Sequence, residues 1–96
     1  MYYAGNHIWA SNKMWPGTIG NIFVTADGKT IASGGSHAHD GITIDLTSEY
    51  KSYYLTFSVE ASTEDDKHRG PFTNDQNYCF KFHGSVDKWD IDQVSC

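Results

Sequence analysis

The sequence predicts an all-β protein: a small antiparallel β-sandwich or barrel of six to seven strands with one disulfide bond. Short segments alternate apolar and polar residues with the period of two that a half-buried strand requires. No segment shows a sustained helical period with capping residues at its ends. Phe, Trp and Tyr make up 15% of the 96 residues, and they bury large apolar areas in a small core. We therefore expect one domain, 1–96.

The N-terminal part of the chain is predicted to contain a hairpin. Residues 2–10 (YYAGNHIWA) are typical of a weak strand, and residues 11–17 (SNKMWPG) are typical of a turn. Residues 18–25 (TIGNIFVT) and 29–33 (KTIAS) lie on either side of Asp27-Gly28. An Asp-Gly pair between two apolar segments strongly favours a β-hairpin.

Two more strands are predicted in the middle of the chain, at 42–46 (ITIDL) and 53–61 (YYLTFSVEA). We expect them to pair through the turn at 47–52 (TSEYKS). Residues 62–76 are nearly all polar and are predicted to be the longest loop. Because long loops in small domains are often functional or mobile, this segment is a candidate functional region.

The C-terminal part is predicted to be a second hairpin, in which 77–83 (NYCFKFH) and 89–96 (WDIDQVSC) flank a turn. Its two ends hold the only cysteines, Cys79 and Cys96, which we expect to form a disulfide in a secreted protein. The expected register places Cys79 opposite Gln93, so this bond requires a bulge or an irregular final turn, and the parity of the apolar residues favours a bulge near Gln93. The alternative is a pair of free thiols in a cytosolic protein.

Charge and hydropathy limit the partners. The net charge is −5, and the basic residues never cluster beyond Lys67 to Arg69, so we expect no nucleic acid partner. No apolar run is long enough to span a membrane. No signal peptide is visible, and we expect Met1 to replace one that has been removed. We expect a monomer.

The segment 34–41 (GGSHAHDG) carries the strongest local signal for a ligand site. In an extended chain His37 and His39 point to the same face, so both imidazoles can bind one divalent metal ion. Asp40 is a further candidate binding residue, and a third ligand could come from another histidine, such as His7. The alternative is a polar connection between strands. We expect no other cofactor.

Catalysis has weaker support in the sequence. No G-x-S-x-G motif supplies a nucleophilic serine. A ribonuclease needs a carboxylate, histidines and a cation, which Glu60, His68, Arg69, His83 and the His37/His39 loop could provide. No motif brings these residues together, so we expect a protein that is not an enzyme.

Two kinds of binding surface are also predicted. Trp9, Trp15 and Trp89 could stack on sugar rings in a carbohydrate-binding module, or they could belong to the core. Exposed strand edges, together with acidic residues between Glu60 and Asp66, could instead bind a basic protein partner.

The chain resembles small secreted β-sandwich proteins of filamentous fungi, of the effector or elicitor type. The paired Cys79 and Cys96, the strand-dense segment 18–60 and the short length carry this resemblance. It implies a secreted, non-enzymatic protein that binds a protein target in a host, into which it can be delivered, or in a competitor. It assigns no functional residue.

Overall fold

The computed structural model describes residues 6–96, and the regular secondary structure of this part of the chain consists of β-strands alone. The eight strands are β1 (His7–Met14), β2 (Ile19–Ala26), β3 (Lys29–His37), β4 (Gly41–Asp45), β5 (Ser52–Val59), β6 (Lys67–Thr73), β7 (Tyr78–Ser85) and β8 (Lys88–Val94). The predicted all-β class is confirmed, with eight described strands where six to seven are predicted.

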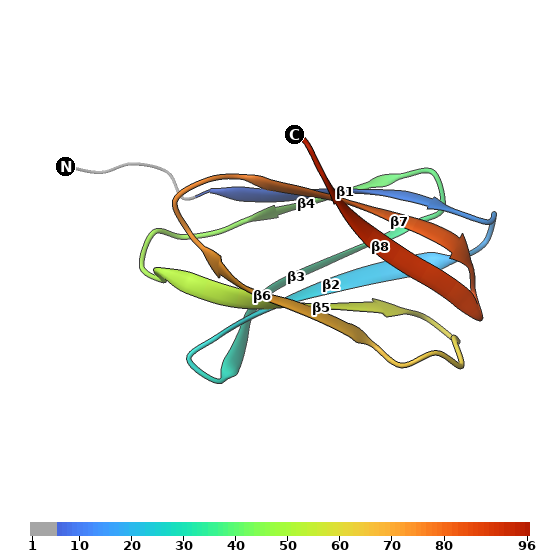
Figure 1. Cartoon of the computed structure of the whole chain (residues 1–96), viewed down its shortest axis with the longest axis horizontal. Coiled ribbons are helices and arrows are strands. Elements are labelled where there is room, and N and C mark those ends of the chain that lie inside the picture. The colour runs from blue at the N-terminus through green and yellow to red at the C-terminus, as the bar shows by residue number, and fades with distance from the viewer. Residues whose placement is uncertain (1–5) are drawn as a thin grey trace.

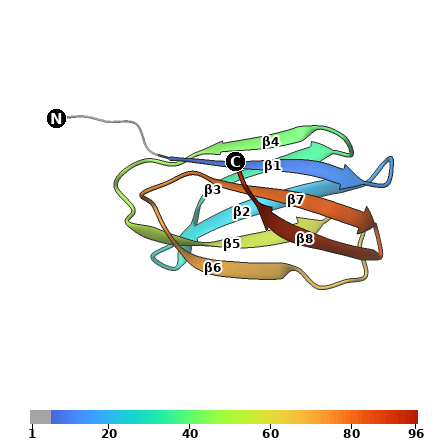
Figure 2. The same cartoon turned by 45° about the horizontal axis from the view of Figure 1, so that its top comes forward.

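The strands form two four-stranded sheets that lie against each other as a sandwich (Figure 1). Sheet A has the order β4-β1-β7-β8, and sheet B has the order β3-β2-β5-β6, as Figure 2 also shows. Neighbouring strands are antiparallel except β1 and β7, which are parallel at the centre of sheet A. The predicted antiparallel sandwich therefore contains one parallel pair.

The core lies between the sheets and is rich in aromatic rings. Alternate residues of β5 and β7 point inward, as their apolar and polar alternation predicts. Neighbouring rings with centroids 5.1 to 5.9 Å apart form a continuous chain through the core, within the range of favourable aromatic contacts. In order, these residues are Tyr53, Phe72, Phe80, Phe57, Phe82 and Trp89.

The two predicted hairpins are confirmed. Strands β2 and β3 pair, and Asp27 and Gly28 between them have φ values of 53° and 79°. Positive φ at both central residues is typical of the type I′ turn that Asp-Gly favours. Strands β7 and β8 also pair, and their two-residue turn is formed by Val86 and Asp87.

The predicted pairing of 42–46 with 53–61 is wrong. Strand β4 pairs with β1 in sheet A, whereas β5 pairs with β2 in sheet B. The chain crosses from sheet B to sheet A between β3 and β4, and returns to sheet B between β4 and β5. Each strand still buries one apolar face, so local alternation alone does not identify the partner strand.

Three segments predicted as loops or turns contain strand residues. Residues 62–76 contain β6, whose residues are mostly exposed because it is an edge strand. Residues 11–17 belong to β1 as far as Met14, and the polar Asn12 there is buried with hydrogen-bond partners. In the segment 34–41, β3 continues to His37 and β4 begins at Gly41, so the connection is only 38–40.

The predicted disulfide between Cys79 and Cys96 is present, with Cα atoms 5.2 Å apart. The predicted bulge near Gln93 is wrong, because the β7–β8 pairing has no register shift. Cys79 pairs with Val94, one residue away from the expected partner Gln93. Cys96 follows Val94 by two residues and so reaches the same face of the sheet as Cys79.

Candidate functional site

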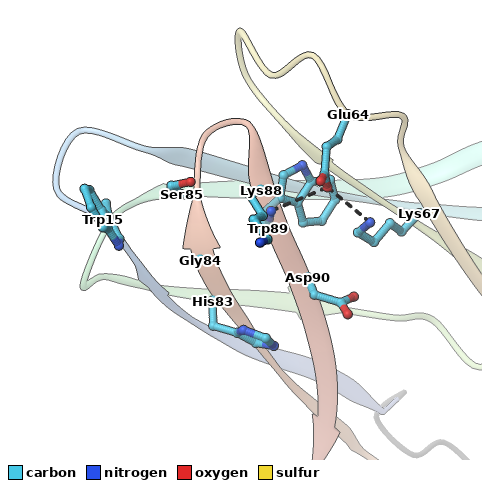
Figure 3. A pocket seen from close by; sticks show the side chains of 9 residues that line it. All are labelled: Trp15, Glu64, Lys67, His83, Gly84, Ser85, Lys88, Trp89 and Asp90. Atoms are coloured by element: carbon cyan, nitrogen blue, oxygen red, sulfur yellow. Dashed lines mark hydrogen bonds and ion pairs between the residues drawn. The ribbon is translucent and has the colours of Figure 1, made fainter.

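A groove lies at one end of the sandwich, where the β1–β2 turn, the β7–β8 hairpin and the beginning of β6 meet (Figure 3). It has a volume of about 620 Å³, within the range of small-molecule sites. We call it the end groove. Its lining residues are Trp15, Glu64, Lys67, His83, Gly84, Ser85, Lys88, Trp89 and Asp90.

Trp15 forms one side of the end groove, and its side chain is 69% exposed. It begins a tight turn in which the Thr18 amide donates a hydrogen bond to the Trp15 carbonyl, 3.2 Å away. Pro16 and Gly17, with φ of 85° at the glycine, fit the central positions of a type II turn. The Trp15 amide also donates to the Gly84 carbonyl, at 3.0 Å. The backbone that carries this exposed ring is therefore held on two sides.

Trp89 contributes to the groove from the core side. Only 3% of this residue is exposed, so it belongs to the core rather than to an open aromatic surface. Its indole Nε1 donates a hydrogen bond to Ser62 Oγ at 3.2 Å. The Lys67 ammonium lies 4.8 Å from the ring centroid, in a cation–π contact. The indole is therefore fixed by partners on two other segments.

Charges of both signs line the end groove. The Glu64 carboxylate accepts a hydrogen bond from the Trp89 amide and pairs with Lys67, both at 3.4 Å. Asp90 lies 3.8 Å from Arg69, which is on β6 like Lys67. Because these carboxylates have cationic or amide partners and Lys88 adds a further positive charge, the site carries no concentrated field of one sign.

Gly84 allows the β7–β8 hairpin to close beside the groove. Its φ is 107°, in a region that L side chains rarely adopt. A Cβ atom here would clash with the Lys88 carbonyl and lie 2.9 Å from Trp89 Cα. The glycine is therefore required by both the backbone conformation and the space available.

The histidines of 34–41 do not form the extended pair that the sequence predicts. His37 ends β3, whereas His39 has a positive φ of 71° and its amide donates to the Asn12 carbonyl. The Asp40 amide donates to the His37 carbonyl at 3.1 Å, which closes a turn. Within residues 6–96, no three His, Cys, Asp or Glu residues are grouped so that they could hold a metal ion.

The residues considered for a ribonuclease are distributed over the molecule. His68 lies on β6 in sheet B, where its ring contacts Thr56 Oγ1 at 3.0 Å. His83 lies on β7 in sheet A, 3.2 Å from Asp92. Glu60 accepts a hydrogen bond from the Asn21 amide group. The two histidines therefore belong to different sheets, and each has its own local partner.

Trp9 is separate from the end groove. It is 37% exposed on the outer face of sheet A and stacks on His7, with ring centroids 5.5 Å apart. Of the three predicted tryptophans, the groove thus brings together Trp15 and Trp89. Sequence reasoning did not connect Trp15 with Trp89 and its neighbours, or with Lys67, because the β1–β2 turn, the β7–β8 hairpin and the start of β6 meet only in the folded sandwich. The Trp-Pro-Gly turn is the local signal that could have indicated it.

The described part of the chain contains no helix that could cross a membrane. The predicted resemblance to fungal effector proteins stays a prediction. No protein-family model, no curated protein and no solved structure matches this chain.

Proposed function

We propose that the protein is a non-enzymatic binding protein that holds an oligosaccharide in the end groove. The exposure of Trp15 carries this proposal. A tryptophan with 69% exposure leaves a large apolar ring in water, which is unfavourable unless a ligand covers it. Its turn is fixed by backbone hydrogen bonds, so stacking a ligand on the ring requires little reordering of the chain.

The polar lining supports a sugar ligand. Sugar hydroxyls both donate and accept hydrogen bonds, and the groove offers carboxylate acceptors in Glu64 and Asp90 and an ammonium donor in Lys88. The mixture of signs suits a neutral ligand better than an anionic one. The carboxylates also have structural partners, which favours binding over acid–base chemistry.

The disulfide bond fits the same role. Disulfides persist in oxidising environments, and the bond between Cys79 and Cys96 is compatible with an extracellular protein. Secretion therefore belongs to this proposal, together with an extracellular glycan as the ligand. A protein target in a host or a competitor is the alternative, and failure of the wild-type protein to bind any sugar in the test below would favour it.

The test is calorimetric titration of the oxidised protein with short soluble oligosaccharides of glucose, N-acetylglucosamine, mannose and xylose. We expect at least one to bind, and Trp15→Ala to weaken that binding at least tenfold. Trp9→Ala is the matched control, since it removes an exposed tryptophan outside the groove and should leave binding unchanged. Absence of binding by every sugar, or equal affinity in the Trp15→Ala variant, would contradict the proposal.

A further inference from the structure

The outer face of sheet B differs in chemistry from the rest of the molecule. One residue in five of the whole chain is charged, but in β2, β3 and β5 the only Asp, Glu, Lys or Arg is Lys29, at the start of β3. The outward residues of these adjacent strands are mostly hydroxyl, amide or aromatic residues. We call this surface the neutral face. Its principal residues are Phe23, Thr25, Ser33, Tyr54 and Thr56, and Asn21 beside them donates a hydrogen bond to the Glu60 carboxylate at 3.1 Å.

Two aromatic side chains lie at the centre of the neutral face. Phe23 is 37% exposed and Tyr54 is 54% exposed. Phe23 pairs with Thr56, and Tyr54 pairs with Thr25, so the two aromatic residues are diagonal neighbours on β2 and β5. Diagonal neighbours in a sheet lie roughly 7–8 Å apart, which lets two rings contact one ligand.

The backbone around these rings holds them in place. Gly70 of the edge strand β6 lies beside Tyr54, and a Cβ atom at Gly70 would be 3.1 Å from Tyr54 Cδ1. The missing side chain thus lets the ring lie against β6. Thr56 lies directly opposite Phe23 and two residues after Tyr54 on β5. Its hydroxyl is hydrogen-bonded to His68. A site built on strands is ordered before the ligand arrives, which lowers the entropy lost on binding.

The composition of the neutral face selects among partners. Nucleic acids and anionic lipid surfaces require clustered cations, which this face lacks. Protein interfaces are depleted in Ser, and Ser and Thr are rare among their strongest contacts. Three strands, each about 4.8 Å wide, and five residues of about 3.3 Å give a patch of roughly 240 Å², whereas each subunit of a stable dimer buries about 800 Å². An uncharged polyhydroxylated surface matches the face in both polarity and charge.

We infer that the neutral face is a second binding surface, for insoluble neutral polysaccharide. The rings of Phe23 and Tyr54 cover the apolar faces of sugar residues, and the surrounding hydroxyl and amide groups form hydrogen bonds with sugar hydroxyls. This surface is on sheet B, whereas the end groove is lined by the ends of β7 and β8 and the segments beside them. The inference therefore does not depend on the groove.

The test is sedimentation of the oxidised protein with insoluble chitin, cellulose and β-1,3-glucan. We expect retention on at least one of them, with little change in 0.5 M NaCl because the contact is uncharged. The double variant Phe23→Thr/Tyr54→Thr should lower the affinity at least tenfold. Threonine is compatible with both strands, so the variant should stay folded. Ser33→Lys is a second variant, which adds a charge without removing a ring, and it should weaken retention at least threefold.

Control variants separate the two surfaces. Trp9→Thr, on the outer face of sheet A, should keep the wild-type retention, and Trp15→Ala measures how much of the retention comes from the end groove. Retention that is lost in Trp15→Ala but kept in the double variant would overturn the inference. The inference would also be overturned if no polysaccharide retains the wild type, or if sedimentation velocity shows a dimer that the double variant abolishes. If no soluble oligosaccharide binds, only the proposal for the end groove is contradicted.

Discussion

The buried side-chain amide of Asn12 donates a hydrogen bond to the backbone carbonyl of Ser36, 3.1 Å away. The same amide group donates to the Thr18 carbonyl at 3.2 Å, and the side-chain oxygen accepts from the Met14 amide at 3.1 Å. Asn12 is fully buried. One side chain thus joins β1 both to the β1–β2 turn and to the end of β3.

We expect Asn12→Ala to lower the free energy of unfolding by about 3 kcal/mol. The change removes three hydrogen bonds and leaves their backbone partners buried. Urea unfolding at 25 °C measures the loss. Asn21→Ala is the control, because Asn21 is partly exposed and its side chain has a single hydrogen bond within residues 6–96, to Glu60, so a loss of about 0.5 kcal/mol is expected. Equal losses in the two variants would contradict the role of Asn12.

Cys96→Ser should lower the free energy of unfolding by about 3 kcal/mol under oxidising conditions. The disulfide closes a segment with a sequence separation of 17, which restricts the unfolded chain. For a domain of this size the melting temperature should fall by roughly 12–24 °C. Reductant should lower the melting temperature of the wild type to that of the variant, and it should leave the melting temperature of the variant unchanged. An unchanged melting temperature in the variant would exclude a stabilising bond.

Tyr53→Phe should raise the free energy of unfolding by about 1 kcal/mol at neutral pH. The Tyr53 hydroxyl is buried and has no hydrogen-bond partner among the described residues, so removing it relieves a desolvation penalty. Tyr78→Phe is a matched control of opposite sign. The Tyr78 hydroxyl accepts a hydrogen bond from Gln76 and contacts Thr73 Oγ1, and its loss should destabilise by about 1 kcal/mol. Urea unfolding of both variants at pH 7 provides the comparison.

Tyr53 also predicts a loss of stability at alkaline pH. Burial raises the pKa of the Tyr53 hydroxyl above its ordinary value of about 10, and the neighbouring Tyr78 and Asp75 raise it further. The folded state therefore holds this proton at pH values where the unfolded state releases it. The contribution of Tyr53 is constant below about pH 10 and falls above it by up to about 1.4 kcal/mol per pH unit. The free energy of unfolding, measured at pH 9 and at pH 11, should show this loss in the wild type and not in Tyr53→Phe.

Gly84→Ala should destabilise the β7–β8 hairpin by at least about 2 kcal/mol, since alanine combines an unfavourable positive φ with a clash against the Lys88 carbonyl. Gly28→Ala is the matched control, with a similar positive φ of 79° and no atom within 4 Å of the added Cβ. We expect about 1 kcal/mol there. The difference, measured by urea unfolding, isolates the clash, and equal losses would mean that the hairpin relaxes around the methyl group.

The local features of the fold could be predicted from sequence, because each depends on residues that are close in the chain. Asp27-Gly28 specifies its hairpin through backbone conformation alone. The inward faces of β4, β5 and β7 follow from alternation, which any half-buried strand must show. The disulfide could be predicted from the number and position of the cysteines.

The partner of each strand could not be predicted in the same way. The alternation of apolar and polar residues along β4 predicts that Ile42 and Ile44 are buried. This pattern is equally compatible with pairing of β4 to β1 or to β5. Strand β6 was missed because it is an edge strand with mostly exposed residues. Asn12 looked like a turn residue, since its burial depends on carbonyls of Thr18 and Ser36 that only the folded chain brings near.

The candidate sites were predicted only in part. The sequence indicates Trp15 and Trp89 as residues that could bind a sugar, but their common groove forms where separate turns meet. The predicted histidine pair requires an extended chain from His37 to His39. The positive φ of His39 shows that the chain turns there instead. The neutral face was missed because it depends on the order of β3, β2 and β5 within sheet B.

The parallel pairing of β1 with β7 joins two segments that are far apart in the chain. Sheet B is built from residues up to Thr73, and its strands are joined by antiparallel pairs. The neighbour of β1 in the centre of sheet A follows later, because β7 ends at Ser85. Until then β1 can pair only with β4, and the inner face of sheet B lacks most of its cover. Contacts between distant segments form slowly, so the inner face of sheet B stays open to association until β7 pairs with β1.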